Sequence, residues 1–362
     1  MINRSNPIIE NFFMNHAINL SYKSYRLITT VLYSNLSISN SEWSVKLNQK
    51  TTVFIMSDYK GWILEATVKE SALACSAPVK LVFIPNRKRS YLRIKDLIKF
   101  FQNRKPQGSC LFVNQNTYFK VVKDSIIDID PERVNIFYTH YSESEFTKLE
   151  QSKILSKCNK IFTYNTFDKI QLIELGVNKE KIDVVYGGIN REIYFPQIAK
   201  KTGDYVLITG DCKERKCPGL LFEVISKMQN INFIIHGRGW DEYCRRFNIP
   251  KSTNLKIIDF DLKINPELMR NASVYLSLSK LEGGPYTTIE ALASGTPVVV
   301  TSTGWNSEIV NDSNGILLPL EVNINQVITA VENTMRLKEK VRGFDLIEGK
   351  FSWEQLGRSI YF

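Results

Sequence analysis

Short apolar runs recur along the chain, and each ends at a glycine, a proline or a small polar residue. Runs of this kind, rich in valine, isoleucine, phenylalanine and tyrosine, are typical of buried strands. Between them lie segments whose apolar residues fall at helical spacing. Because strands that alternate with helices favour a parallel sheet, the pattern predicts an α/β protein. We expect strands at 52–56, 81–84, 110–113, 134–138, 160–164, 205–209, 232–235, 255–258, 274–278, 298–301 and 315–319, and one that opens residues 183–196.

The same alternation divides the chain into two βα-rich halves on either side of residue 200. A chain of 362 residues is long enough for two domains, each with its own core. The segment 197–203 reads as the linker between them. Residues 1–50 are rich in serine and asparagine toward their end and fit neither half, so we treat them as an extension.

Charge adds a second feature to this picture. The net charge is +10, and residues 87–105 are the most basic region, with apolar residues interleaved at helical spacing. This region is either an ordinary amphipathic helix docked on the sheet or a basic face that meets anionic lipid headgroups. Nucleic acid is a third partner for such a charge, but we read no nucleic-acid module and expect no such binding.

The six cysteines are scattered without a Cys-x-x-Cys pair, which is typical of free thiols in a reducing compartment. Cys212 and Cys217 with His236 lack the paired spacing of a metal site. The N-terminus does not have the charged start and continuous apolar core of a secretory signal. We therefore expect a cytoplasmic protein, with a peripheral membrane contact through 87–105 as the open alternative.

The stretch 274–297 carries the most specific chemistry. Glu282 and two glycines follow an apolar strand, and Glu290 lies eight residues after Glu282. Pro285 suits the first position of a helix, where its missing N–H has no cost. Free amides and the dipole at a helix start favour an anion. A hydroxyl acceptor, an anion cradle and a second acceptor match the sugar, diphosphate and ribose of a nucleotide-sugar, although two surface glutamates around an ordinary helix give the same spacing.

The detailed sequence of this stretch is more informative than its spacing. Glu-Gly-Gly-Pro, a second glutamate, and then Ala-Leu-Ala-Ser-Gly-Thr-Pro-Val-Val resemble the Glu-x7-Glu element of retaining glycosyltransferases of family four, the glycosyl transferase group 1 type. The resemblance spans about residues 52–362 and is strongest over 205–319. It implies the GT-B fold, in which two Rossmann-like domains face an interdomain cleft. On this fold the chain would divide into an N-terminal extension at 1–50, an acceptor domain at 51–200 and a donor domain at 201–345. A C-terminal helix at 346–362 would cross back to the first domain.

The resemblance also implies the residues of the site. Glu282 would lie against the donor sugar, Lys216 at the donor diphosphate, and His140, at the end of a strand, would approach the sugar from the first domain. Glu290 would bind the ribose hydroxyls, and the loop at Gly237 and Arg238 would line the base pocket. The donor-binding set as a whole is Gly61, Arg215, Lys216, Gly237, Arg238, Gly283, Gly284, Pro285, Tyr286, Thr287 and Glu290.

The activity implied is transfer of a sugar from a nucleotide-diphosphate sugar to a glycan or lipid-linked acceptor, with retention of anomeric configuration. The leaving diphosphate would be stabilised by Lys216 and helix amides, and would take the acceptor proton on the same face. Since a lysine and amides neutralise the phosphates, we expect no metal and no cofactor besides the nucleotide-sugar co-substrate.

One residue departs from the family pattern. The family carries a Gly-Arg pair before the lysine, whereas Asp211 follows Gly210 here and would repel a diphosphate. Arg215 is a candidate to replace the missing arginine. The departure also favours an alternative, a catalytically inactive nucleotide- or glycan-binding GT-B protein. Asp-x-Asp pairs at 128–130 and 259–261 would suit a metal-dependent enzyme, but matches of two residues are common by chance.

Overall fold

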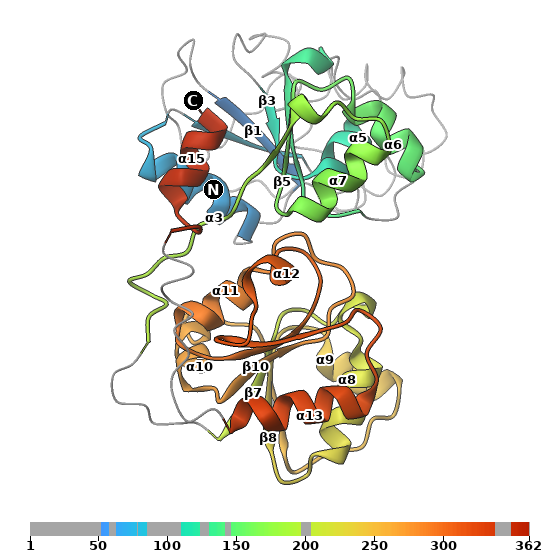
Figure 1. The fold of residues 1–362 in the computed structure, drawn as a ribbon, viewed down its shortest axis with the longest axis vertical. Coiled ribbons are helices and arrows are strands. Elements are labelled where there is room, and N and C mark those ends of the chain that lie inside the picture. The colour runs from blue at the N-terminus through green and yellow to red at the C-terminus, as the bar shows by residue number, and fades with distance from the viewer. Residues whose placement is uncertain are drawn as a thin grey trace, which may run out of the picture.

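The computed structural model describes residues 52–57, 63–77, 79–84, 110–123, 130–141, 146–196, 204–336 and 349–361. Two α/β domains stand one above the other (Figure 1), and each is built on a parallel sheet. This confirms the fold class expected from the alternating strands and helices. The predicted extension, the basic region 87–105, Gly61 and the linker 197–203 lie outside the described residues.

The sheet of the first domain has the strand order β2-β1-β3-β4-β5-β6, and every neighbouring pair is parallel. Its central strand β4 is buried along its whole length, which explains why the sequence shows an almost continuous apolar run there. The strands are β1 (Thr52–Ser57), β2 (Val79–Ile84), β3 (Cys110–Phe112), β4 (Val134–Tyr138), β5 (Lys160–Thr163) and β6 (Ile182–Val184).

The sheet of the second domain has the order β12-β11-β10-β7-β8-β9 and is also parallel. The order reverses between β7 and β10, and open α/β sheets bind ligands beyond the carboxyl ends of strands at such a point. The strands are β7 (Tyr205–Thr209), β8 (Asn232–His236), β9 (Leu255–Ile258), β10 (Val274–Ser277), β11 (Val298–Thr301) and β12 (Gly315–Leu318).

Helices cover the sheets, and several of them begin at a residue whose side chain caps the free backbone amides. A capping box of Thr147 and Glu150 begins α6, a second of Asn323 and Gln326 begins α13, and Asn165 caps α7. The helices are α3 (Ile63–Ala74), α5 (Gln115–Lys123), α6 (Lys148–Leu155), α7 (Thr166–Glu174), α8 (Pro218–Lys227), α9 (Trp240–Arg246), α10 (Asn265–Asn271), α11 (Tyr286–Ala293), α12 (Asn306–Ile309), α13 (Ile324–Met335) and α15 (Trp353–Tyr361).

Three local expectations were wrong. Pro285 is the N-cap of α11 and not its first helical residue, because its ψ of 88° is not helical. The sequence favours Ser142 as the cap of a helix over 143–155, whereas α6 starts at Lys148 with Thr147 as its cap, and Ser142 lies outside the described residues. Helices α5 and α9 were missed: the β-branched and aromatic residues of α5 and the glycines before α9 both argue against a helix in a sequence-based reading.

An aromatic cluster joins the two domains. Tyr164 of the first domain meets Tyr286 and Trp305 of the second edge-on, with ring centroids 6.4 and 5.8 Å apart. Trp353, at the start of α15, stacks on Tyr286. The cluster belongs to one continuous buried core that includes residues of both sheets. Such burial makes the contact between the domains part of the fold and not a loose encounter.

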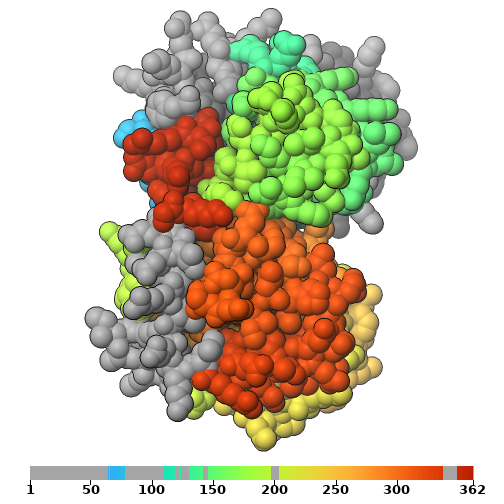
Figure 2. Space-filling model, viewed as in Figure 1, coloured from blue at the N-terminus to red at the C-terminus, as the bar shows by residue number. Residues whose placement is uncertain are grey.

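Helix α15 returns to the first domain and lies along α3 (Figures 1 and 2). The Ser71 and Tyr361 hydroxyl groups are 3.1 Å apart, and the Cys75 thiol donates to the carbonyl of Glu354. The last helix of the chain therefore contacts both domains, through Trp353 on one side and Tyr361 on the other. In the part of the chain that the structure describes, no helix has the length and apolar character needed to cross a membrane.

Residues 185–196 follow β6 and lead from the first domain toward the second, and we call this segment the crossover. A glycine on it, Gly188, tests the packing against Trp353. A Cβ at Gly188 would overlap the Trp353 ring, whereas a Cβ at Gly349 would meet nothing within 4 Å. We expect Gly188→Ala to lower the free energy of unfolding by about 1–3 kcal/mol through overpacking. Gly349→Ala should change it by less than about 0.5 kcal/mol. Urea unfolding of both variants measures this difference, and equal stability would contradict the tight contact at Trp353.

Candidate active site

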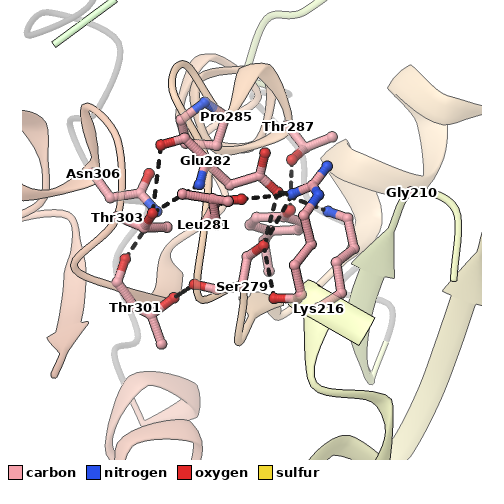
Figure 3. Close-up of polar contacts among 12 residues, drawn as sticks. Gly210, Lys216, Ser279, Leu281, Glu282, Pro285, Thr287, Thr301, Thr303 and Asn306 are labelled. Atoms are coloured by element: carbon pink, nitrogen blue, oxygen red, sulfur yellow. Dashed lines mark hydrogen bonds and ion pairs between the residues drawn. The ribbon is translucent and has the colours of Figure 1, made fainter. Parts of the chain in front are cut away.

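Glu282 lies in the loop after β10, at the point where the strand order of the second sheet reverses. Its Oε1 accepts a hydrogen bond from the Ser279 hydroxyl at 2.8 Å and lies 3.3 Å from Lys216 Nζ. Arg215 Nη1 binds the same oxygen. Figure 3 shows the Lys216 side chain pointing toward Glu282 from the side of Gly210. Two cations from the β7 side therefore converge on one carboxylate from the β10 side.

The loops that carry these groups are joined by further hydrogen bonds. Arg215 Nη1 also donates to the Leu281 carbonyl at 2.8 Å, and the Lys280 amide donates to the Arg215 carbonyl at 2.7 Å. The Glu282 amide donates to Thr303 Oγ1 at 2.8 Å. These bonds hold the backbone at Glu282 from both sides, so the carboxylate is held in one place before any ligand arrives.

The local charges decide the ionisation of Glu282. Burial by itself raises the pKa of this carboxyl, but the charges of Lys216 and Arg215 and the hydrogen bonds from Ser279 and Arg215 outweigh it and lower the pKa to about 2. Glu282 is therefore an anion at neutral pH. The side chains of Glu282 and Lys216 are each only 14% exposed, whereas Arg215 is 34% exposed and faces solvent more openly.

Gly210 makes the position of Lys216 possible. Its φ of +110° lies in a region that residues with a Cβ rarely adopt. A Cβ there would also lie 3.2 Å from the Cε and Nζ atoms of Lys216. The six-residue spacing between Gly210 and Lys216 therefore corresponds to a direct contact: the lysine passes over the glycine on its way to Glu282.

Of the two glycines after Glu282, the first allows the domains to approach each other, and the second allows close packing within the second domain. A Cβ at Gly283 would overlap the Thr139 carbonyl at the end of β4, and a Cβ at Gly284 would overlap the Trp305 ring. Asn165 of the first domain donates from Nδ2 to the Gly283 carbonyl at 3.0 Å. The loop expected to bind the donor is thus also a contact between the domains, a role that its sequence does not reveal.

His140 follows Thr139 and is close enough to Arg215 and Glu282 for both charges to affect it. Burial lowers the pKa of its imidazole, with a smaller opposing effect of the bond to Tyr141. His140 Nδ1 lies 2.9 Å from the Tyr141 carbonyl, which can only accept, so Nδ1 carries the proton and Nε2 keeps its lone pair. Gln115, fully buried on α5, fixes this turn by donating to the His140 carbonyl and accepting from the Thr139 amide at 3.0 Å.

The remaining donor-binding candidates occupy different surroundings. The Tyr286 side chain points into the interdomain cluster, where its hydroxyl lies 3.1 Å from Thr67 Oγ1, so its backbone alone can serve an anion at the start of α11. The Thr287 hydroxyl is 2.6 Å from that of Tyr275. Among the described residues, the structure brings together Lys216, Arg215, Glu282 and His140, and places Glu290 in a separate hydrogen-bonded group.

Asp211, the departure from the family pattern, has a partner of its own. Its carboxylate binds Arg238 in two places, at 3.0 Å to Nε and 3.2 Å to Nη2. Gly237 allows the two loops to meet, because a Cβ there would overlap the Gly210 carbonyl. The negative charge at 211 is therefore compensated, and the guanidinium of Arg238 stands beside the glycine loop. No pattern in the sequence indicates this pair, since the two residues lie on different βα loops.

Metal-ligating groups do not gather in the part of the chain that the structure describes: no cluster there holds three or more His, Cys, Asp or Glu side chains. Asp261 of the predicted Asp-x-Asp pair accepts from the Lys263 amide at 2.9 Å and so closes a turn of its own loop. All six cysteines are free thiols.

Glu290 gives a test of the electrostatics. Burial raises the pKa of its carboxyl to about 7, against smaller opposing effects of Tyr194 and Asn265. The folded state thus binds a proton that the unfolded state releases above about pH 4.5, so stability falls as pH rises through 7. We expect the melting temperature of the wild type, relative to Glu290→Gln, to fall by roughly a few degrees between pH 5 and 8. Groups that titrate in both proteins affect both melting temperatures equally, so they do not contribute to the difference. A difference in melting temperature that does not change with pH would contradict the raised pKa of Glu290.

Comparisons with known proteins found one curated relative of significant similarity. The chain is 30% identical over 212 residues to an uncharacterised glycosyltransferase of Methanocaldococcus jannaschii, a match that covers 54% of this chain and 56% of that protein. The chain thus spans about half the length of this relative.

Solved structures extend the likeness to the whole fold. Anabaena HepE in complex with UDP-glucose superposes with a TM-score of 0.68 at 13% identity, covering 86% of this chain and 98% of that one. A sucrose-phosphate synthase of Thermosynechococcus elongatus gives 0.66 at 13% identity, over 86% and 97%. A glycosyltransferase of Rickettsia africae gives 0.65 at 15% identity, over 87% and 98%. Residues 190–345 match the family model described as glycosyl transferases group 1. The second half of the chain is therefore similar to the glycosyl transferases group 1 domain, and the chain has the two-domain fold of GT-B glycosyltransferases.

Proposed function

We propose that the protein is a retaining glycosyltransferase that moves a sugar from a nucleotide-diphosphate sugar to a glycan or lipid-linked acceptor. The observation that carries this proposal is the convergence of Lys216 and Arg215 on the ionised Glu282, beyond the carboxyl ends of β7 and β10. Two cations suit a diphosphate, and a carboxylate between them suits the hydroxyl groups of the attached sugar. His140 stands on the opposite domain, where its unprotonated Nε2 can accept a hydrogen bond from a hydroxyl group of the donor sugar.

The chemistry follows from these placements. The bond between the anomeric carbon and the diphosphate oxygen breaks, and the negative charge that develops on that oxygen lies where Lys216 and Arg215 stabilise it. The acceptor oxygen bonds to the anomeric carbon on the face that the diphosphate leaves, which retains the configuration. Its proton passes to the leaving phosphate oxygen. The amides at the start of α11 add to the stabilisation, because they point toward an anion placed before the helix.

Several parts of the proposal have separate support. The lysine and arginine pair supports a metal-independent reaction, because the two groups supply the positive charge that a metal would bring. The UDP and UDP-glucose complexes of HepE make uridine diphosphate sugars the first donors to test. Residues 87–105 stay the predicted site of a membrane contact, and they lie outside the described residues.

The alternative is a nucleotide- or glycan-binding protein that kept the fold and lost catalysis. Asp211 was the feature in its favour, because an unpaired carboxylate would repel a diphosphate. Its ion pair with Arg238 removes that argument, although the pair does not by itself establish turnover. Hydrolysis of a bound nucleotide-sugar separates the two functions, since an inactive protein binds the donor without breaking it.

Alanine substitutions at Lys216 and Glu282 test the catalytic assignment. We expect each to lower donor turnover by about 100- to 1000-fold, because each removes a charge at the reacting bond. The donor is first selected from a panel of nucleotide-sugars by thermal stabilisation, and turnover is then followed as nucleoside diphosphate release. Lys213→Ala is the matched control, since Lys213 lies on the same loop with an exposed side chain. Full activity of either site variant, folded as judged by its melting curve, would refute the assignment.

A second pair of variants tests which arginine serves the diphosphate. We expect Arg215→Ala to weaken nucleoside diphosphate binding about 10- to 100-fold, as loss of a hydrogen-bonded charge does. Asp211→Ala should change it by less than about threefold, because the charge of Asp211 is already compensated by Arg238. Titration calorimetry with UDP, GDP and ADP measures both effects. Unchanged affinity in Arg215→Ala would show that this arginine does not replace the one missing at 211.

A further inference from the structure

Glu290, the proposed ribose-binding residue, belongs to a hydrogen-bonded group whose other members, Tyr194, Asn265 and His236, are buried. Asn265, at the start of α10, donates from Nδ2 to Glu290 Oε2 at 3.1 Å and to the Tyr194 hydroxyl at 3.1 Å. Because that hydroxyl accepts from Asn265, its own proton is available for Glu290, which it contacts. Glu290 is thus held from two sides by neutral donors.

The orientation of the Asn265 amide is determined by a histidine behind it. The Asp261 amide donates to His236 Nε2 at 2.9 Å, so that nitrogen carries no proton and Nδ1 must carry it. His236 Nδ1 lies 3.2 Å from Asn265 Oδ1 and therefore donates to it. With its oxygen engaged by the histidine, Asn265 presents its NH2 group to Glu290. His236 and Asn265 are almost completely buried, at 0% and 2% exposure, so water does not compete for these bonds.

Tyr194 comes from a different part of the chain, the crossover that links the domains. This crossover is fixed to α10 by Arg270, whose Nη1 donates to the Ile193 carbonyl at 2.7 Å and whose guanidinium lies 4.7 Å from the centre of the Phe195 ring. The hydroxyl that reaches Glu290 is therefore carried by a segment held in place on both sides of residue 194.

We propose that Tyr194 and Asn265, the latter oriented by His236, are positioning residues that hold the Glu290 carboxylate for the ribose hydroxyl groups of the nucleotide. This inference rests on the proposed function, because it assumes a nucleotide bound along α11. Above about pH 7, where the Glu290 carboxyl is mostly ionised, the carboxylate accepts up to about four hydrogen bonds, so the two donors leave acceptor positions for a diol. A carboxylate fixed in this way needs no rearrangement when the ribose arrives, which strengthens its bonds to the diol.

The chain of hydrogen bonds from the Asp261 amide through His236 and Asn265 to Glu290 also connects the loop after β9 with helix α11. It starts at the backbone of the loop after β9 and ends at the ribose carboxylate, through His236, which stacks on Phe260 with centroids 5.0 Å apart. A shift of that loop would release His236 Nε2, and the Asn265 amide would then lose the constraint on its orientation. The selectivity of the site for a ribose therefore depends on residues that do not touch it.

The test compares a ribonucleotide with its counterpart that lacks both ribose hydroxyl groups. Titration calorimetry gives the Kd of the best-binding member of UDP, GDP and ADP, and of its 2′,3′-dideoxy form. We expect the wild type to prefer the ribonucleotide about 10- to 100-fold. Tyr194→Phe and Asn265→Leu should each reduce this preference at least about threefold, while the Kd of the dideoxy form changes less than about twofold.

Tyr205→Phe is the matched control, because Tyr205 donates to the Leu268 carbonyl of the same helix α10 and does not contact Glu290. It should keep the full preference. Tyr194→Phe removes a single oxygen atom, so it keeps the proposal testable if Asn265→Leu fails to fold. An unchanged preference in Tyr194→Phe, or an equal loss of both nucleotides, would overturn the positioning role alone. A wild type that binds none of the three nucleoside diphosphates would overturn the proposed function as well.

Discussion

A buried carboxylate is stable only beside groups that compensate its charge, and the candidate site is arranged around the carboxylate of Glu282. Its removal from water is costly, and the charges of Lys216 and Arg215 offset this cost only because both lie within contact distance. Each partner in turn depends on something else: Lys216 on the left-handed Gly210, and Arg215 on the carbonyl of Leu281. The ion pairs place two cations beside one carboxylate, with Lys216 largely shielded from water and Arg215 partly open to it. In the proposed function, a diphosphate would therefore meet a charge distribution that already exists.

The contact between the domains uses the same loop. Gly283 touches Thr139, and its carbonyl accepts from Asn165, so the residue next to Glu282 also joins the domains. Glu308 repeats this theme, since its Oε1 accepts from the Thr166 amide at the start of α7 at 2.7 Å and its Oε2 accepts from Tyr186 of the crossover. The aromatic cluster around Tyr286 adds apolar burial to these polar bonds. The distance between His140 and Glu282 is therefore set by the packing of the interface and not by either domain alone.

The spacing of apolar residues predicts the positions of strands and helices, but it does not predict contacts between distant side chains. Strands such as β7 and β11 are short apolar runs bounded by turn residues, and their positions agree with the structure. The resemblance to the family placed Lys216 and Glu282 in one donor site. The structure adds their direct contact, which Gly210 allows because it has no Cβ. Contacts between side chains far apart in the sequence had no such signal. Asp211 looked like a repulsive charge because its partner, Arg238, lies on another loop, and Asn165, Gln115 and Tyr194 looked like ordinary polar residues. A pattern along the chain records which face is buried, but it does not record which buried polar groups meet.

The arginine charges of the candidate site lie at other positions than in the family pattern. Where the family pattern has one arginine next to the glycine, this chain has Arg215 at Glu282 and Arg238 at Asp211. Arg215 is held by the Leu281 carbonyl and Ser279, and Arg238 by a carboxylate at the vacated position. The residue at 211 thus changes the place of the positive charge in the candidate site: Arg215 and Arg238 stand there, although the arginine that the family pattern has after Gly210 is absent.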